Sequence, residues 1–147
     1  MSILSVGYAL YIANSYGSSD FQYSPTVLFK NKINPYEYFL YSENLDKIIK
    51  VQYPVYTHAS FIFLFIFSLI DYEISRLIWS CLNIILAMTS VIIISKKAEI
   101  KNYETIILLC IFLMSTPFRN CIGNGQFSII VLISYCSIFI NNAFIRN

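Results

Sequence analysis

Apolar runs alternate with short polar stretches along the whole chain, and the clearest run is "LIWSCLNIILAMTSVIIIS", Leu77 to Ser95. It holds about 19 residues without a charge, and Asn83 is its only strongly polar side chain. A helix that crosses the hydrocarbon core of a membrane needs about 20 such residues. We therefore expect a transmembrane helix over residues 74–95, with Asn83 turned toward another helix rather than toward lipid.

Two later runs have the same apolar character but are shorter. "TIILLCIFLMST" is followed by Pro117, which cannot continue a helix. "FSIIVLISYCSIFI" comes after a stretch that contains Gly123 and Gly125. The two runs predict transmembrane helices over residues 105–118 and 127–141, joined by a loop over residues 119–126.

Two other runs are too short to cross a membrane by themselves. "ASFIFLFIFSLI", Ala59 to Ile70, would reach only about 18 Å as a helix, against a hydrocarbon core of roughly 30 Å. We expect residues 55–70 to form a juxtamembrane or re-entrant helix; an ordinary span that extends through Val55 is the alternative. Residues 1–16 are expected to be the end of a first transmembrane helix. A signal peptide is the competing interpretation, but no basic start and no clear cleavage site are present.

The segment between these two short runs, residues 17–54, is polar and rich in tyrosine. Its charges balance, because four acidic residues stand against four basic ones: Asp20, Glu37, Glu43 and Asp46 against Lys30, Lys32, Lys47 and Lys50. Within it, "NLDKIIK", Asn44 to Lys50, has the pattern of a short amphipathic helix that lies on a surface. We expect residues 17–54 to be a loop outside the membrane.

The lysines indicate which ends of the expected helices face the cytoplasm. Lys96, Lys97 and Lys101 form the densest basic cluster, and short loops with excess positive charge stay in the cytoplasm. Residues 96–104 are therefore expected to be cytoplasmic. The loop 119–126, one span later, is then extracytoplasmic. If residues 55–70 do not cross the membrane, the loop 17–54 is extracytoplasmic as well; if they cross, the loop 17–54 is cytoplasmic.

Composition supports an integral membrane protein and narrows its chemistry. Of the 147 residues, 57% are hydrophobic and 12% are charged, about half the charge of a soluble domain. The net charge is only +2 and no basic patch is present, so nucleic acid is not an expected partner. Three of the four cysteines lie inside apolar runs, where a thiol behaves as a small hydrophobe. The single histidine, His58, argues against a classical zinc site, and we expect no cofactor.

Several short motifs follow one another in a characteristic order. They are Asp20-Phe21, Asn34-Pro35-Tyr36, Tyr53-Pro54, "ISRLIW" ending at Trp79, and Gly125-Gln126. This order resembles bacterial glycosyltransferase family 87, which belongs to the GT-C class of multi-spanning enzymes and includes alpha-mannosyltransferases. Two positions depart from the family pattern: Val55 replaces the second proline of a "YPP" element, and Ser128 replaces an asparagine after "GQ".

The resemblance implies an all-α, multi-spanning GT-C-like helical bundle with an extracytoplasmic first loop and a juxtamembrane helix. It covers most of the chain but only about the first third of a typical member, so we expect a truncated or split member that need not be active alone. The implied reaction transfers a mannose-like hexose from a polyprenyl-phosphate donor to a glycan or glycolipid acceptor of the cell envelope. The implied location is the bacterial inner membrane, among its lipids, with the active face extracytoplasmic. The alternative is a small non-enzymatic membrane protein, such as an accessory subunit or a transporter fragment.

The resemblance singles out Asp20 as the catalytic general base, because the attacking hydroxyl must lose a proton at the water–lipid boundary. A solvated loop aspartate, or a helix N-cap before "FQYSPTVLF", is the structural alternative. No second acidic residue neighbours Asp20 in the sequence, so a divalent metal is not expected in this part of the chain.

Four further residues are candidate substrate ligands. Arg119 has the fork of donors that grips a lipid phosphate, or it extends to the headgroups as an interfacial arginine. Gln126 would bind sugar hydroxyls or cap the helix that follows. Tyr53 and His58 flank Pro54 and would line the acceptor site, unless they belong to an interfacial aromatic belt.

Overall fold

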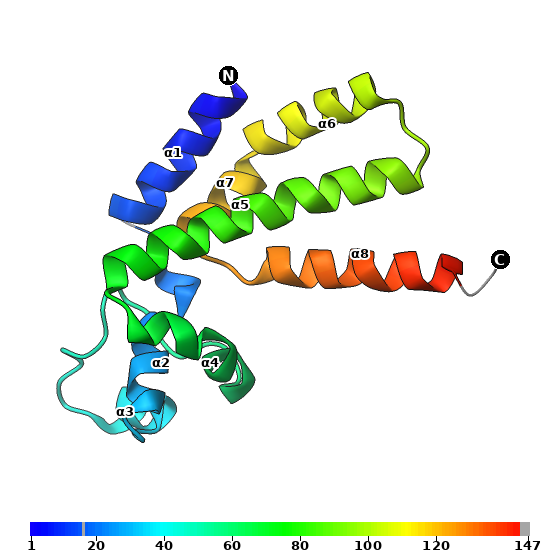
Figure 1. Cartoon of the computed structure of the whole chain (residues 1–147). Helices are drawn as coiled ribbons and strands as arrows, with labels where there is room; N and C mark the ends of the chain where they lie inside the picture. Colours follow the sequence, from blue (N-terminus) through cyan, green and yellow to red (C-terminus); the bar gives the residue numbers. More distant parts are fainter. Residues whose placement is uncertain (16, 145–147) are drawn as a thin grey trace.

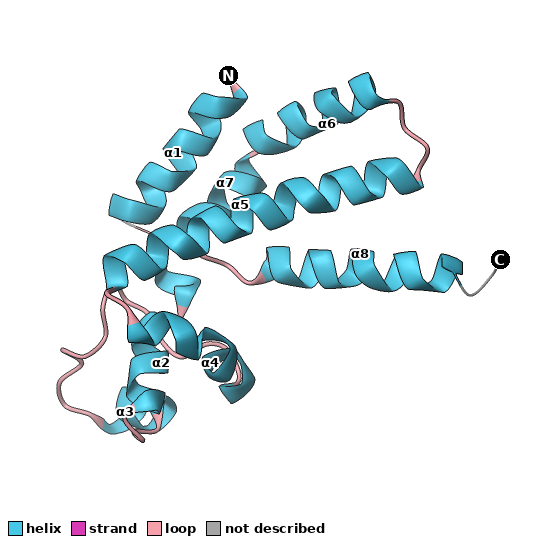
Figure 2. Ribbon diagram, viewed as in Figure 1, coloured by secondary structure: helices cyan, strands magenta, loops and turns pink. Residues whose placement is uncertain are grey.

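The computed structural model describes residues 1–15 and 17–144, with side chains as far as Cys136, and this part of the chain contains helices and no strand (Figure 2). The expectation of an all-α fold is confirmed. In chain order the helices are α1 (Ser2–Ser15), the 3-10 helix η1 (Ser19–Phe21), α2 (Tyr23–Lys30), α3 (Pro35–Tyr41), α4 (His58–Leu64), the 3-10 helix η2 (Phe65–Leu69), α5 (Tyr72–Lys97), α6 (Asn102–Met114), α7 (Thr116–Asn124) and α8 (Ser128–Phe144).

The helices form two groups, which Figure 1 shows clearly. In the first group, α5 packs against α8 and α6, and α1 packs against α5, α6 and α7. The second group consists of the short helices α2, α3, α4 and η2, which gather beside the first residues of α5. The loop between α5 and α6 lies at the far end of α5. The short helices therefore cap one end of the layer of long helices.

Helix α5 is the one helix among the described residues that is long and apolar enough to cross a membrane by itself. It has 26 residues, because Tyr72–Arg76 and the two lysines at its end extend the apolar run. Glu73 in the first turn and Lys96 and Lys97 in the last turn oppose the charges of the helix dipole. Asn83 is buried and donates a hydrogen bond to the carbonyl of Trp79, 2.9 Å away, so the inward orientation expected for Asn83 is confirmed.

Helices α6 and α7 meet at a bend of 58°, and together they pass the same test of length and composition for one broken span. Ser115 starts α7, because its hydroxyl accepts a hydrogen bond from the Phe118 backbone N–H at 3.3 Å and Pro117 follows in the first turn. Gly125 ends α7 with a φ of 71°. Residues 119–124 were expected to be a loop but are helical. The cap at Ser115 and the glycine at position 125 define this helix, which the polar composition of the segment does not indicate.

The apolar run from residue 58 to residue 69 does not form one straight helix. It changes from α-helix to 3-10 helix after Leu64, and both parts contact α2. The Lys30 ammonium donates to the Ser68 carbonyl at 3.0 Å. These contacts hold the run beside the other short helices, at the end of the layer where α5 begins (Figure 1).

The expectation of an amphipathic helix over residues 44–50 is wrong, because this segment forms turns and irregular backbone. The Ser24 hydroxyl accepts the backbone N–H of Ile49 at 2.9 Å. Lys50 and Val51 have left-handed φ values of 52° and 57°, which an α-helix does not allow. A hydrogen bond to a distant part of the chain thus outweighs the local apolar pattern.

Two buried clusters join the elements. Around α7, the buried side chains come from four helices: Ala9, Ala87, Phe118, Ile122 and Ile129. Near the start of α5, Trp79 stacks on Phe21 with ring centroids 5.5 Å apart, and Leu64 lies against them. The second cluster fixes the 3-10 turn η1, which carries Asp20, against α5.

Candidate active site

Asp20 lies in the turn between α1 and α2, where the chain leaves the long helices and enters the cap. It is half-buried and belongs to η1. The residues on either side of η1, Ser18 and Gln22, both have left-handed backbone, with φ of 68° and 56°. This conformation is unfavourable for residues other than glycine, so tertiary contacts must hold the turn in place.

Two glutamines whose side chains are completely buried supply those contacts. The Gln22 amide donates to the Tyr53 carbonyl at 2.8 Å, and its oxygen accepts the Val55 backbone N–H at 3.2 Å. The Gln52 oxygen accepts the Ser24 backbone N–H at 2.9 Å, and its amide donates to the Ser18 carbonyl at 2.8 Å. The segment after the loop is therefore fastened to both sides of the turn that carries Asp20.

Helix α7 approaches the same turn through its glycines. The Ser18 backbone N–H donates to the Gly123 carbonyl at 2.8 Å. A Cβ atom on Gly125 would lie 3.0 Å from Cβ of Phe21. The Trp79 indole N–H donates to the Gly125 carbonyl at 2.9 Å. Asp20 precedes Phe21 and Gln126 follows Gly125, so the backbone segments that carry these two predicted site residues lie against each other.

Gln126 follows the end of α7 and precedes α8, where it belongs to a small polar cluster. Its side-chain oxygen accepts hydrogen bonds from the Cys121 thiol at 3.2 Å and the Ser128 hydroxyl at 3.4 Å. These contacts orient the amide group. An oriented amide can donate a hydrogen bond to a sugar hydroxyl or accept one from it.

Tyr56 belongs to this site, although the sequence did not single it out. Its ring lies 4.9 Å from that of Phe127, and its hydroxyl forms a hydrogen bond with the Phe127 backbone. Burial and the negative charge of Asp20 raise the pKa of the Tyr56 phenol, against a smaller lowering by the Phe127 hydrogen bond. The phenol is therefore protonated at neutral pH and able to donate. Twelve tyrosines are present, and no spacing distinguishes this one from the others.

Arg119 lies elsewhere on α7. Its guanidinium donates to the Met114 carbonyl at 3.2 Å and to the Thr116 hydroxyl at 3.0 Å. It lines an open cavity of about 470 Å³ together with Leu4 and Tyr8 of α1. Arg119 thus faces the first half of α1, whereas Asp20 follows its last residues.

His58 and Tyr53 are also separate from Asp20 and Gln126. The His58 ring is 5.0 Å from that of Tyr36, and it lines an open cavity of about 360 Å³ with Phe29 and Lys32. The Tyr53 ring lies 4.7 Å from that of Phe39. Only the Tyr53 backbone is tied to the Asp20 turn, through the Gln22 amide.

Neither a metal centre nor a disulfide marks the site. Across the described side chains, no three of His, Cys, Asp and Glu come together. The four cysteines are all free thiols. Among the groups near this turn are the Asp20 carboxylate and the Tyr56 phenol, on which the Asp20 charge acts.

A comparison with known protein families identifies the family of this chain. The family model of glycosyltransferase family 87 matches residues 55–139, which is more than half of the chain. The chain belongs to glycosyltransferase family 87. The resemblance stated from the motifs is therefore confirmed, and members of this family are membrane glycosyltransferases. Tyr56, His58, Arg119 and Gln126 lie within the matched residues, whereas Asp20 precedes them. No curated protein and no solved structure matches the chain.

Proposed function

We propose that this family 87 protein transfers a mannose-like hexose from a polyprenyl-phosphate donor to a glycan or glycolipid acceptor, with Asp20 as general base. The observation that supports the proposal is that the turn carrying Asp20 packs against Gly125, next to Gln126, and that the Asp20 charge acts on the Tyr56 phenol. A glycosyltransferase needs a proton acceptor beside groups that bind sugar hydroxyls, and these three side chains supply both.

The proposed reaction balances without a cofactor. The acceptor hydroxyl attacks the anomeric carbon of the donor sugar, and its proton passes to the Asp20 carboxylate. The bond between that carbon and the phosphate oxygen breaks, and polyprenyl phosphate leaves with the electron pair. Gln126 binds hydroxyls of the sugar. The negative charge of Asp20 raises the pKa of the Tyr56 phenol, which is protonated at neutral pH.

The arrangement of the helices supports a location for this reaction. Asp20 and the cap lie where α5 begins, whereas Lys96, Lys97 and Lys101 lie at or beyond its other end (Figure 1). If the lysine-rich loop is cytoplasmic, then Asp20 is extracytoplasmic, and residues 58–69 stay on that side. We accordingly propose a multi-pass protein of the bacterial inner membrane with its site on the extracytoplasmic face.

The other candidate ligands keep their predicted roles within this proposal. Arg119 would bind the donor phosphate, and His58 and Tyr53 would contact the acceptor. Because these residues lie apart from Asp20, the roles need extended substrates, as a lipid-linked donor and a long glycan acceptor are. If Arg119 binds the donor phosphate, an Arg119→Gln variant should have a higher KM for the donor and an unchanged kcat.

The direct test uses membranes that contain the complete chain, radiolabelled polyprenyl-phosphate mannose and a lipid-extract acceptor. Asp20→Asn keeps the size of the side chain but removes the base, so transfer should fall by roughly 10² or more. Asp46→Asn, an exposed position in the same loop, is the matched control and should leave transfer unchanged. Near-normal transfer by Asp20→Asn would refute its role as the general base.

A further inference from the structure

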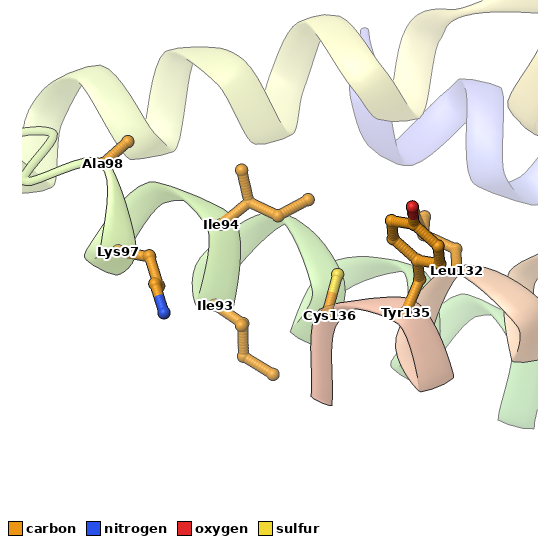
Figure 3. Close-up of a pocket in the computed structure, with 7 residues that line it drawn as sticks. All are labelled: Ile93, Ile94, Lys97, Ala98, Leu132, Tyr135 and Cys136. Carbon is orange, nitrogen blue, oxygen red and sulfur yellow. The ribbon is translucent and has the colours of Figure 1, made fainter. Parts of the chain in front are cut away.

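The open cavity of about 360 Å³ in the cap lies between the end of α2, the residue before α3 and the start of α4. Its lining combines two apolar side chains with three that can form hydrogen bonds: Phe29, Ile33, Lys32, Asn34 and His58. The cavity of about 350 Å³ between α5 and α8 differs from it, because the described side chains around that cavity are mainly hydrophobic (Figure 3). An apolar wall with a few polar groups is the usual form of a site for a small polar ligand.

Lys32 occupies a position where the backbone favours glycine. Its φ is 60°. The Lys32 N–H donates to the Phe29 carbonyl at 3.0 Å, and the Ile33 N–H donates to the Leu28 carbonyl at 3.0 Å. These two bonds form the Schellman motif that ends many helices, usually with glycine at the position that Lys32 holds here. Because a lysine is disfavoured in this conformation relative to glycine, a role for Lys32 belongs to its side chain.

The Lys32 side chain is exposed and its charge is not neutralised by a neighbour. Within the described part of the chain, it makes no ion pair or hydrogen bond. Two other lysines of the same loop differ: Lys30 donates to the Ser68 carbonyl at 3.0 Å, and Lys50 donates to the Ser15 carbonyl at 2.8 Å. An ammonium carries three N–H donors and a positive charge, so Lys32 offers its charge to an anion that enters the cavity.

The rest of the lining indicates a ligand larger than an inorganic anion. The Phe29 ring lies 6.1 Å from the His58 ring, which lies 5.0 Å from that of Tyr36. The Asn34 side-chain oxygen accepts the Tyr36 backbone N–H at 3.1 Å, which leaves the amide nitrogen as a donor. A sugar ring has an apolar face that packs on aromatic side chains, and its hydroxyls bond with amides and imidazoles. The lining thus suits a sugar that carries a negative charge.

We propose that this cavity binds a hexose with an anionic group, a carboxylate or a phosphate, which the Lys32 ammonium contacts while the ring packs on Phe29. The cavity lies at the last turn of α2, whereas Asp20 precedes its first residue, and eight helical residues span about 12 Å. The bound sugar is therefore not the one that reacts at Asp20. The inference rests on the proposed function in one respect: the sugar is assigned to the acceptor glycan, as a unit away from the reacting hydroxyl. The cavity would then select acidic acceptors.

The test uses the complete chain in phosphatidylcholine nanodiscs and three probes: methyl glucuronide, glucose 6-phosphate and the neutral methyl glucoside. Saturation-transfer NMR measures the dissociation constant of each complex. We expect at least one anionic probe to bind about threefold more tightly than methyl glucoside, the worth of one partly exposed charge pair. The anionic probe with the larger preference identifies the group as carboxylate or phosphate. Lys32→Gln should remove the preference, and Lys47→Gln, an exposed lysine of the same loop outside the cavity lining, should keep it.

Two further variants separate binding from folding. Lys32→Gly should also remove the preference but raise the unfolding temperature, because glycine suits a φ of 60°. Ile33→Trp would fill the cavity and weaken the binding of all three probes, whereas Leu40→Trp, at an exposed position of α3, would not.

Three results would overturn the proposal: equal affinities of the wild type for the three probes, equal losses in the Lys32→Gln and Lys47→Gln variants, or no effect of Ile33→Trp. Inorganic phosphate that binds as tightly as the better anionic probe would also overturn it, because the sugar ring would then contribute nothing. The measurement involves no transfer reaction. Absent binding together with normal transfer by wild-type membranes would therefore overturn this inference alone, and binding without any transfer would count against the proposed function alone.

Discussion

Gly17 lies so close to Gly123 that a Cβ atom on Gly17 would come within 1.9 Å of the Gly123 carbonyl oxygen. The same oxygen accepts the Ser18 backbone N–H at 2.8 Å. A hydrogen bond and a contact that only glycine permits thus join the end of α1 to α7. Through this contact, Asp20 and Gln126 keep their positions relative to each other.

Gly17→Ala should therefore weaken the fold and the site together. The added methyl group meets backbone rather than a side chain that could move aside, and overpacking of this kind costs about 1–3 kcal/mol. Thermal unfolding of the detergent-solubilised chain measures the loss. Gly7→Ala is the control, because nothing lies within 4 Å of a Cβ atom there. Equal unfolding temperatures for the two variants would contradict the close contact.

Trp79→Phe should loosen Gly125 and, with it, the neighbouring Gln126. The indole N–H bonds to the buried Gly125 carbonyl at 2.9 Å, and leaving that oxygen without a partner costs about 1–3 kcal/mol. We expect a lower unfolding temperature together with a larger KM for the sugar donor. Leu77→Ala, at an exposed position of the same helix, controls for general effects on α5. An unchanged KM would contradict the prediction that Trp79 helps to position Gln126.

The raised pKa of Tyr56 predicts how stability depends on alkaline pH. Burial is the main cause and the Asp20 charge the second, so the folded chain loses the phenol proton less readily than the unfolded chain. The contribution to stability is complete below about pH 10, the ordinary pKa of tyrosine, and is lost as the pH rises through the higher pKa of the folded state. Unfolding temperatures measured across this range should fall less steeply for Tyr56→Phe than for the wild type. Tyr41→Phe, at an exposed position, is the control, and parallel curves for wild type and Tyr56→Phe would contradict the prediction.

The proposed topology predicts which cysteines a membrane-impermeant maleimide can reach. In a background with all four native cysteines replaced by serine, Asp20→Cys should react in intact cells or right-side-out vesicles. Lys101→Cys should react only after the membrane is made permeable. The reverse pattern would place the Asp20 turn in the cytoplasm, where the proposed reaction has no lipid-linked sugar of the required orientation.

The pattern of apolar runs and charged residues was enough to predict the features that depend on local sequence. The all-helical fold, the helix around residues 77–95 and the buried Asn83 all follow from where charges interrupt apolar runs. The break between α6 and α7 follows from Pro117, because proline has no backbone N–H to donate to the preceding helical turn. These features need no knowledge of which segments meet in space.

Features decided by contacts between distant segments were not predictable in this way. Residues 44–50 have an amphipathic pattern, yet the Ser24 hydroxyl takes the Ile49 N–H and no helix forms. Tyr56 enters the site because Phe127, more than seventy positions later in the sequence, packs on its ring. Gln22 and Gln52 look like ordinary loop residues until the hydrogen bonds that their side chains make across the loop are seen.

The two left-handed residues that flank Asp20 have a consequence for related chains. Ser18 and Gln22 each adopt a backbone conformation that disfavours L-residues by roughly 1–2 kcal/mol. The carboxylate is thus presented by a turn that would relax if its amide anchors were removed. In a relative without a hydrogen-bonding side chain at the position of Gln52, we expect glycine or asparagine at the positions of Ser18 and Gln22, because the turn would otherwise relax and the aspartate would move.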